Sequence, residues 1–278
     1  MKGFHKLLCY ACNSGNLELV KYLIEEHKLN INNKFKYEGV IRGDIDVLWE
    51  ENYTLGLLAL IEAVRTENLE LVKYFVEEHE VDVNAKTPNG NILNEVRVRF
   101  YFKLEIVEYL IEKGANVEND FGSEILCRAS EDVNLKLVKL LIEREIDINS
   151  KYKYLTALRY ASMNGYLEIV KYLVENGASD INDALMLASG RGYLEIVKFL
   201  IEHGADINAK KYGYTALMHA VEKGYSDIAK YLVESGADIN TENAIGETLL
   251  RLASKKGNLE IVKYLVEKGA DVNIEDDS

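Results

Sequence analysis

The stretch Leu194–Asn208, LEIVKFLIEHGADIN, occurs eight times along the chain with small changes. The other seven copies begin at Leu17, Leu69, Leu104, Leu135, Leu167, Ser226 and Leu259. Successive copies therefore start 52, 35, 31, 32, 27, 32 and 33 residues apart. A period of this length is typical of an array of stacked units, each packed on its neighbours. The two outlying intervals indicate an insertion before the second copy and a deletion before the sixth.

The apolar residues of this stretch recur with the period of an α-helix. Leu194, Val197, Leu200 and Ile201 fall on one face, and charged residues fall between them. Gly204 follows, and glycine favours the left-handed backbone that ends many helices. Each copy is therefore predicted to be a short helix followed by a turn.

A second helical signal lies upstream of each copy. Before the seventh copy it runs from Thr215, a residue type that caps helix N-termini, to Gly224, a residue type that ends helices. The same frame occurs at Thr156–Gly165 and at Thr248–Gly257. Each repeat is thus predicted to be a pair of short helices that buries its apolar faces only by stacking on its neighbours.

This pattern, TALMHAVEKG at Thr215–Gly224 followed by LEIVKYLVEKGADVN at Leu259–Asn273 in the next copy, resembles the ankyrin repeat. The resemblance covers essentially the whole chain. It implies an all-α fold class, an ankyrin repeat solenoid of stacked antiparallel helix pairs joined by β-hairpin fingers. The amino-acid sequence of the copies is most similar to that of the ankyrin repeat families of giant DNA viruses of amoebae (mimivirus-like).

We predict one domain over residues 1–278, with repeats at 1–32, 54–84, 85–119, 120–149, 150–182, 183–208, 209–240 and 241–273. An inserted finger at 33–53 and an acidic tail at 274–278 complete the chain. The first repeat starts directly at its helix and is interpreted as a cap. The last has no polar cap after it, so self-association of that face is an alternative to the monomer that we expect.

Composition excludes several classes of partner. The net charge of −13 argues against nucleic acid, because binding to phosphates needs a basic surface. No apolar run is long enough to span a membrane, and the N-terminus lacks the apolar length of a signal peptide. Three cysteines suit a reducing compartment. We therefore expect a cytoplasmic location, which is the host cell cytoplasm if the chain is viral.

No motif points to catalysis, a metal or a cofactor. Cys9 and Cys12 form a C-x-x-C that could be a redox pair or half of a zinc site, but both lie in the first predicted helix without a second ligand pair. The five histidines fall on different repeats or at helix ends. Phosphate-binding, nucleophile-elbow and zinc-protease motifs are missing from the sequence. We predict that the protein is not an enzyme and binds no cofactor.

The loops before repeats 2, 5 and 7 are basic and aromatic, although the chain is acidic. Tyrosine is favoured in protein interfaces, and lysine at a rim can steer a partner. The alternative is that lysine and tyrosine are simply common in this chain. The candidate binding residues in these loops are Phe35, Tyr37, Lys151, Tyr152, Lys153, Tyr154, Lys210, Lys211, Tyr212 and Tyr214.

The loop before repeat 6 is missing, since Asn182 runs directly into Asp183. The lysine–tyrosine fingers of repeats 5 and 7 should therefore flank a notch on the order of 20 Å across, given the usual spacing of packed helices. A row of first-helix residues should lie beside the fingers. We predict that this row contains Arg65, Phe100, Met163, Arg191, Glu222 and Lys255.

Two further aromatic features have alternative interpretations. Trp49, in the inserted finger, either packs with nearby aliphatic residues on repeats 1 and 2 or belongs to an interaction arm. Phe100 and Tyr101 either form an exposed patch with Phe102 or turn at least one ring inward. Together with Met163 and Arg191, they complete the set of candidate binding residues.

The leading functional hypothesis is a non-enzymatic scaffold that binds a protein of unknown identity, a host protein if the chain is viral. The alternative, implied by the resemblance to some viral ankyrin proteins, is a substrate adaptor for a ubiquitin ligase. A third possibility is a purely structural or a modified protein, since asparagines such as Asn208 and Asn240 resemble those that hydroxylases modify in ankyrin repeats.

Overall fold

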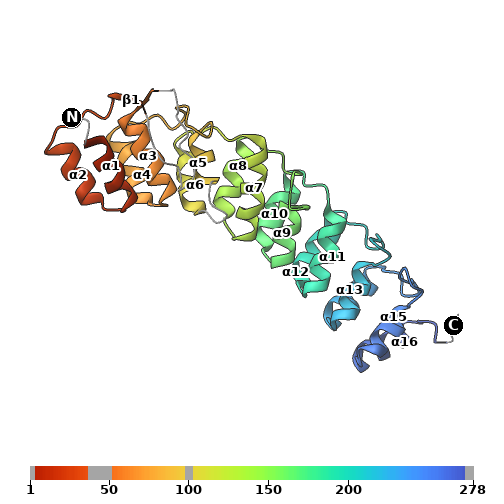
Figure 1. Ribbon diagram of the computed structural model, residues 1–278. Helices are drawn as coiled ribbons and strands as arrows, with labels where there is room; N and C mark the ends of the chain where they lie inside the picture. Colours follow the sequence, from red (N-terminus) through yellow and green to blue (C-terminus); the bar gives the residue numbers. More distant parts are fainter. Residues whose placement is uncertain (1–3, 37–51, 98–102, 273–278) are drawn as a thin grey trace. The chain divides into compact units, whose positions relative to one another are not determined.

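Each copy of the repeated stretch forms the second helix of a pair in the computed structural model, which describes residues 4–36, 52–97 and 103–272. The chain divides into two units, Met1–Phe121 and Gly122–Ser278, and the boundary falls within one helix, α7. In each unit, neighbouring helix pairs lie side by side (Figure 1). The expected fold class, an array of short helix pairs with hairpins between them, is confirmed.

The first unit contains three helix pairs and one two-stranded sheet. The pairs are α1 (Phe4–Asn13) with α2 (Leu17–Glu25), α3 (Leu55–Arg65) with α4 (Leu69–Lys73) and the π-helix η1 (Tyr74–Glu78), and α5 (Ile92–Arg97) with α6 (Leu104–Glu112). The sheet pairs β1 (Lys34–Lys36) with β2 (Asn52–Thr54) in antiparallel register, so the two ends of the insertion form a hairpin.

The second unit follows the same plan. Its pairs are α7 (Asn119–Glu131) with α8 (Leu135–Glu143), α9 (Ala157–Asn164) with α10 (Leu167–Glu175), α11 (Ile181–Arg191) with α12 (Leu194–Glu202), α13 (Ala216–Lys223) with α14 (Ser226–Glu234), and α15 (Leu249–Lys255) with α16 (Leu259–Glu267). The strands β3 (Lys151–Tyr152) and β4 (Leu155–Thr156) form an antiparallel hairpin before α9. No helix in the described part of the chain has the length and apolar character needed to cross a membrane.

The predicted helix ends are confirmed. The hydroxyl of Thr156 accepts a hydrogen bond from the backbone N–H of Arg159 at 3.3 Å, and that of Thr215 accepts one from Met218 at 3.2 Å. Gly224 ends α13 with a φ of +80°. In α12, Val197 and Leu200 are fully buried, whereas Leu194 and Ile201 are half-buried at the edges of the apolar stripe. A threonine cap at the start and a glycine at the end therefore define α13, as the sequence predicts.

The asparagine at the end of a copy connects neighbouring repeats. The side chain of Asn208 donates from Nδ2 to the carbonyl oxygen of Gly236 at 3.4 Å and accepts at Oδ1 from the backbone N–H of Asp238 at 2.9 Å. Asn149 bonds in the same way to Gly177 and Ser179 of the next repeat. These bonds satisfy backbone groups in the turns and fix the register between repeats.

The π-helix η1 was not predicted. The copy at Leu69–Asn84 has one residue more than the copy at Leu194–Asn208, and the wider turns of η1 accommodate it. The first copy carries the same extra residue, but α2 ends at Glu25 without a π-helix and the residue lies in the turn that follows. The sequence pattern predicts the insertion, but its structural position depends on the packing around each helix.

Candidate protein-binding site

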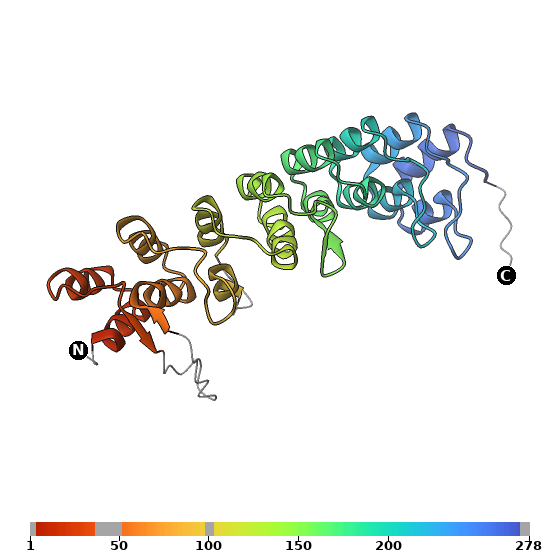
Figure 2. The ribbon, with the colours of Figure 1, turned by 90° about the horizontal axis from the view of Figure 1, so that it is seen from above.

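Two of the predicted fingers end in two-residue turns. In the finger of repeat 5, Lys151 pairs with Thr156 and Tyr152 pairs with Leu155, so Lys153 and Tyr154 form the tip. Their φ angles are +49° and +71°. Two consecutive positive φ angles are the mark of the type I′ turn, which matches the twist of the flanking strands. In Figure 2 this green hairpin extends beyond the neighbouring helices.

The finger of repeat 7 is built in the same way. Lys211 and Tyr214 form an isolated antiparallel bridge, and Tyr212 and Gly213 between them have φ angles of +50° and +81°. Gly213 is required here, because a Cβ at this position would lie 2.5 Å from the backbone nitrogen of Ala244 in the next finger. Finger 7 is therefore held against the finger of repeat 8.

A tyrosine occupies a tip position in both fingers. Tyr154 is 90% exposed and Tyr212 is 87% exposed. Side chains other than glycine and asparagine are disfavoured at positive φ, at a cost of about 1 kcal/mol or more per residue. Each tip thus presents an aromatic ring to solvent from a backbone conformation that would favour a smaller residue.

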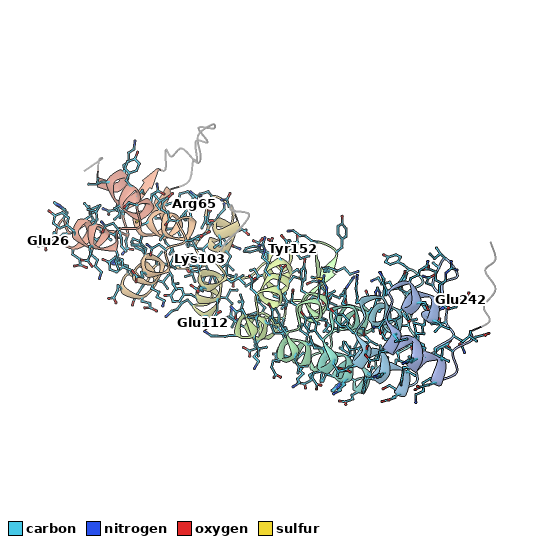
Figure 3. All side chains as sticks on the ribbon, turned by 90° about the horizontal axis from the view of Figure 1, so that it is seen from below. Glu26, Arg65, Lys103, Glu112, Tyr152 and Glu242 are labelled. Carbon is cyan, nitrogen blue, oxygen red and sulfur yellow. The ribbon has the colours of Figure 1, made fainter. Side chains whose placement is uncertain are left out.

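The other two finger tyrosines lie against their own chain. Arg128 donates from Nη2 to the hydroxyl of Tyr152 at 3.1 Å and lies over the Tyr152 ring, 5.4 Å from its centroid (Tyr152 is labelled in Figure 3). The hydroxyl of Tyr214 accepts a hydrogen bond from Nδ2 of Asn243 at 3.3 Å, and its ring lies 5.3 Å from that of His219. Tyr152 and Tyr214 therefore support the fingers, while Tyr154 and Tyr212 are free to contact a partner.

The finger lysines also differ in whether they bond within the chain. Lys211 pairs with Asp183, and Lys210 donates to the backbone oxygen of Glu242 at 3.2 Å. Lys153 lies 5.1 Å from the centroid of the Tyr152 ring. Lys151 is exposed and has no bonding partner among the described residues. The positive charge of the fingers is therefore only partly neutralised within the chain.

A cavity of about 800 Å³ opens in the second unit beside finger 7. Its floor includes Met186, Leu187 and Gly190 from α11, and its walls include His219 and Tyr225 from the repeat 7 helix pair. Tyr212 and Tyr214 line it from the finger side. The cavity lies beside α11, which has no finger before it, and it is lined by residues of finger 7 but by none of the finger of repeat 5. The notch between the two fingers stays a prediction.

The start of α11 explains this opening. α11 begins at Ile181, two residues before the boundary of 183 predicted for repeat 6, and no hairpin precedes it within the described residues. Asp180 at its N-terminus accepts a hydrogen bond from the hydroxyl of Thr156 at 2.7 Å. The chain thus passes from the turn after α10 directly into α11, which leaves the space between fingers 5 and 7 uncovered.

Arg191 was misassigned in the first-helix row. Met163 and Glu222 each lie four residues before the start of the following helix, and the residue at that position in repeat 6 is Gly190. Arg191 is one residue further along and is exposed. Both Gly190 and Arg191 line the cavity.

An ion-pair network connects finger 7 to the helices. Asp183 pairs with Lys211 and, at 3.4 Å, with Nη1 of Arg159. Nη1 of Arg159 also lies 3.4 Å from the carbonyl oxygen of Tyr154, to which it donates. Burial lowers the pKa of His219, and the nearby Glu222 carboxylate opposes this change. A neutral imidazole therefore lines the cavity at neutral pH.

The remaining candidates do not join this site. Met163 is half-buried in α9, and the backbone of Phe35 lies in β1. In the first-helix row, Arg65 donates from Nη2 to the buried carboxylate of Glu95 at 2.6 Å and is engaged within the fold (Figure 3). Four candidates lie outside the described residues: Tyr37, Trp49, Phe100 and Tyr101.

The cysteines have the properties of buried structural residues. Cys9, Cys12 and Cys127 are free thiols, and Cys12 is buried in α1. Burial, with a smaller contribution from the Glu62 charge, raises the pKa of Cys9 to about 12 and also raises that of Cys12. Within the described residues, no group of three or more histidine, cysteine or acidic side chains is arranged to hold a metal ion.

Asp183, Gly190, His219 and Tyr225 were not predicted as site residues. Aligning the repeats position by position would have revealed Gly190, since the neighbouring repeats carry a side chain there. The other three could not be identified in this way, because their role depends on which side chains meet after stacking.

Comparison with known proteins identifies the repeats independently. The family model described as ankyrin repeats (3 copies) matches residues 3–91, 97–184 and 179–243, and the model of a single ankyrin repeat matches residues 245–277. A putative ankyrin repeat protein of Acanthamoeba polyphaga mimivirus is 32% identical over 142 residues, which is 47% of this chain and 46% of that protein. A second mimivirus ankyrin repeat protein is 40% identical over 76 residues, 27% of this chain and 12% of that protein.

The similarity extends beyond viruses. Alpha-latrocrustotoxin-Lt1a of the spider Latrodectus tredecimguttatus is 28% identical over 238 residues, which is 62% of this chain and 16% of the toxin. The chain therefore spans less than half the length of these curated relatives. What they share with it is the repeat array.

Proposed function

The chain belongs to the ankyrin repeat family, and we propose that it binds a partner protein between the fingers of repeats 5 and 7. Ankyrin repeats form non-enzymatic scaffolds for protein–protein interaction. A repeat array suits this role because its stacked units offer an extended surface made of side chains from several repeats. In this chain, the proposed surface consists of the two fingers and the α11 helix between them.

The observation that carries this proposal is the pair of tip tyrosines. Tyr154 and Tyr212 are almost fully exposed, and both are held at positive φ. Tyrosine supplies a large contact area at low conformational cost, and it is enriched among residues that dominate binding energy. A surface without a partner would gain stability from asparagine or glycine at these positions, because both residue types favour the type I′ turn.

The proposed setting is the cytoplasm. Three free thiols suit a reducing compartment. The mimivirus relatives favour a viral protein that acts on a host protein. The role of ubiquitin-ligase adaptor is a narrower version of the same function, and none of the described residues favours it over other binding roles.

Copurification from amoebal cells with quantitative mass spectrometry tests the proposal. The wild-type chain is compared with the double variant Tyr154→Ser, Tyr212→Ser, which removes both tip rings and leaves the supporting Tyr152 and Tyr214. Tyr10→Ser with Tyr22→Ser is the matched control, because these two tyrosines are 69% and 55% exposed in the first unit.

We expect a partner that is enriched with the wild type and the control and is lost with the tip variant. Enrichment that is equal for the tip variant and the wild type would contradict binding at the fingers. A ubiquitin-ligase subunit among the enriched proteins would support the adaptor role.

A further inference from the structure

We infer that the cavity beside finger 7 receives an acidic segment of the partner protein, with one apolar side chain inserted over Gly190. This inference rests on the proposed function and adds the chemistry of the segment that is bound. Three features of the second unit support it: the origin of the cavity, the residues of its floor and walls, and the charges around it.

Two losses occur at the same place in the array. Repeat 6 has no finger, and it has a glycine where Met163 and Glu222 stand in the neighbouring repeats. Gly190 lies inside α11 and its φ is not in the left-handed region; a Cβ there would lie 3.5 Å from Cβ of His219, an ordinary contact. Neither the backbone conformation nor packing requires glycine, so its effect is to leave the cavity floor open.

The floor and walls suit an apolar side chain. Met186 and Leu187 supply aliphatic surface, and Tyr214, His219 and Tyr225 surround it with rings. Burial keeps the His219 imidazole neutral, so it adds no charge to the wall at neutral pH. A volume of about 800 Å³ lies within the range of pockets that bury a drug-sized ligand, which is enough for one large side chain. An aromatic or large aliphatic side chain would therefore be buried here.

The charges around the cavity are mainly positive, although the whole chain carries −13. Four cations line it, Arg159, Arg191, Lys211 and Lys223, against two anions, Asp183 and Glu222. Asp183 is shared by Arg159 and Lys211, and Glu222 lies 3.7 Å from Lys256. Both anions are thus already neutralised within the chain.

Two cationic side chains at the cavity retain capacity for a partner. Arg191 and Lys223 are exposed and form no ion pair within residues 103–272. Carboxylates of a bound segment would satisfy these donors, and charge-assisted hydrogen bonds are stronger than neutral ones. A basic segment would instead meet uncompensated positive charge.

A displayed library of random short peptides, selected on the full-length wild-type chain, tests the inference. We expect the selected peptides to share one Leu, Met, Phe, Tyr or Trp flanked by Asp and Glu. The affinity of a selected peptide is then measured by fluorescence polarisation for the wild type and for two sets of variants.

The first set fills the cavity in steps. Gly190→Ala adds only a Cβ and should change affinity little, whereas Gly190→Met places a long side chain on the floor and should weaken binding by about tenfold or more. Circular dichroism and thermal unfolding of both variants establish that the fold is retained. Because the two variants differ only in side-chain length, a difference between them reports on the cavity.

The second set changes charge. Arg191→Glu with Lys223→Glu should weaken binding by about tenfold or more. Lys171→Glu with Lys263→Glu is the control, because it makes the same change in net charge on the second helices α10 and α16. The control should bind within about twofold of the wild type, since it alters only long-range attraction.

Failure of the inference is distinguishable from failure of the proposed function. Peptides without acidic residues, peptides that bind Gly190→Met as tightly as the wild type, or no selected peptide at all would overturn the inference. A cellular partner that is lost with the tip-tyrosine variant but retained by Gly190→Met would overturn the inference alone. A partner retained by the tip-tyrosine variant would contradict the proposed function itself.

Discussion

At the scale of single residues, Gly190 is a position at which the fold does not require glycine, and we assign the glycine to the proposed binding site. It lies within α11, where glycine costs about 0.5–1 kcal/mol relative to alanine because of its greater backbone freedom. Since an added Cβ meets only His219 at an ordinary contact distance, alanine fits the site. We predict that Gly190→Ala raises the free energy of unfolding by about 0.5–1 kcal/mol. Urea unfolding followed by circular dichroism measures this, and a decrease would show that the fold requires glycine.

Asn208, in contrast, stabilises the fold, since both the nitrogen and the oxygen of its side-chain amide bond to the next repeat. Asn208→Ala leaves the Gly236 carbonyl and the Asp238 N–H without these partners. We predict a loss of about 1–2 kcal/mol in unfolding free energy, because exposed turns can partly replace the bonds with water. Asn164→Ala, which removes only a bond to Tyr160 within α9 and its C-terminal turn, is the control. Equal effects of the two variants would argue against a register-fixing role for Asn208.

His219 makes stability depend on pH. Its pKa is lowered in the folded chain, mainly by burial, so the folded state binds a proton less readily than the unfolded state. Its contribution to stability is therefore present above the unfolded-state pKa of about 6.5 and is lost as the pH falls below it. We predict that His219→Gln reduces the decrease in unfolding free energy between pH 7.5 and pH 5.5. Urea unfolding at both pH values measures this, and an equal decrease in His219→Gln and the wild type would contradict the assignment to His219.

At the scale of elements, finger 5 shows a conflict between turn chemistry and sequence. Lys153 and Tyr154 occupy a turn for which Asn-Gly is favoured, because both positions have positive φ. We predict that Lys153→Asn with Tyr154→Gly raises the free energy of unfolding by about 0.5–1 kcal/mol and weakens partner binding. Thermal unfolding and a binding titration on the same samples measure the two effects. A destabilised finger, or a stabilised one with unchanged binding, would contradict the assigned role of the tip.

The elements themselves were largely predictable. The helix pairs followed from the period of the apolar residues, their ends from Thr215 and Gly224, and the lack of a finger directly before α11 from the missing loop. Each of these signals is local in sequence. The π-helix η1 was not predictable, because the same extra residue is accommodated in a turn in repeat 1.

The sequence also could not predict which finger tyrosines are exposed and which bond to neighbouring repeats. Tyr152 is held by Arg128, 24 residues earlier, and Tyr214 by Asn243, 29 residues later. Both contacts form only when neighbouring repeats stack. The sequence could therefore place four tyrosines on two fingers, but it could not separate the two tip rings from the two supporting ones.

At the scale of the whole molecule, the residues that stabilise the array differ from those of the proposed binding surface. The buried stripes and the asparagine bonds recur from repeat to repeat, whereas the exposed tip tyrosines, the missing finger and Gly190 lie, among the described residues, in repeats 5 to 7. A repeat array allows this separation because each unit contacts only its neighbours, so a local change leaves distant repeats intact. The proposed binding surface is therefore a local departure from a regular scaffold.

The affinity of the copurified partner for the wild type and for Tyr154→Ser, Tyr212→Ser tests the central claim most directly. We predict that the variant binds at least about tenfold more weakly, a loss of about 1.4 kcal/mol or more, while its thermal unfolding matches that of the wild type. Equal affinity of the two proteins would contradict the claim that the fingers of repeats 5 and 7 form the binding surface.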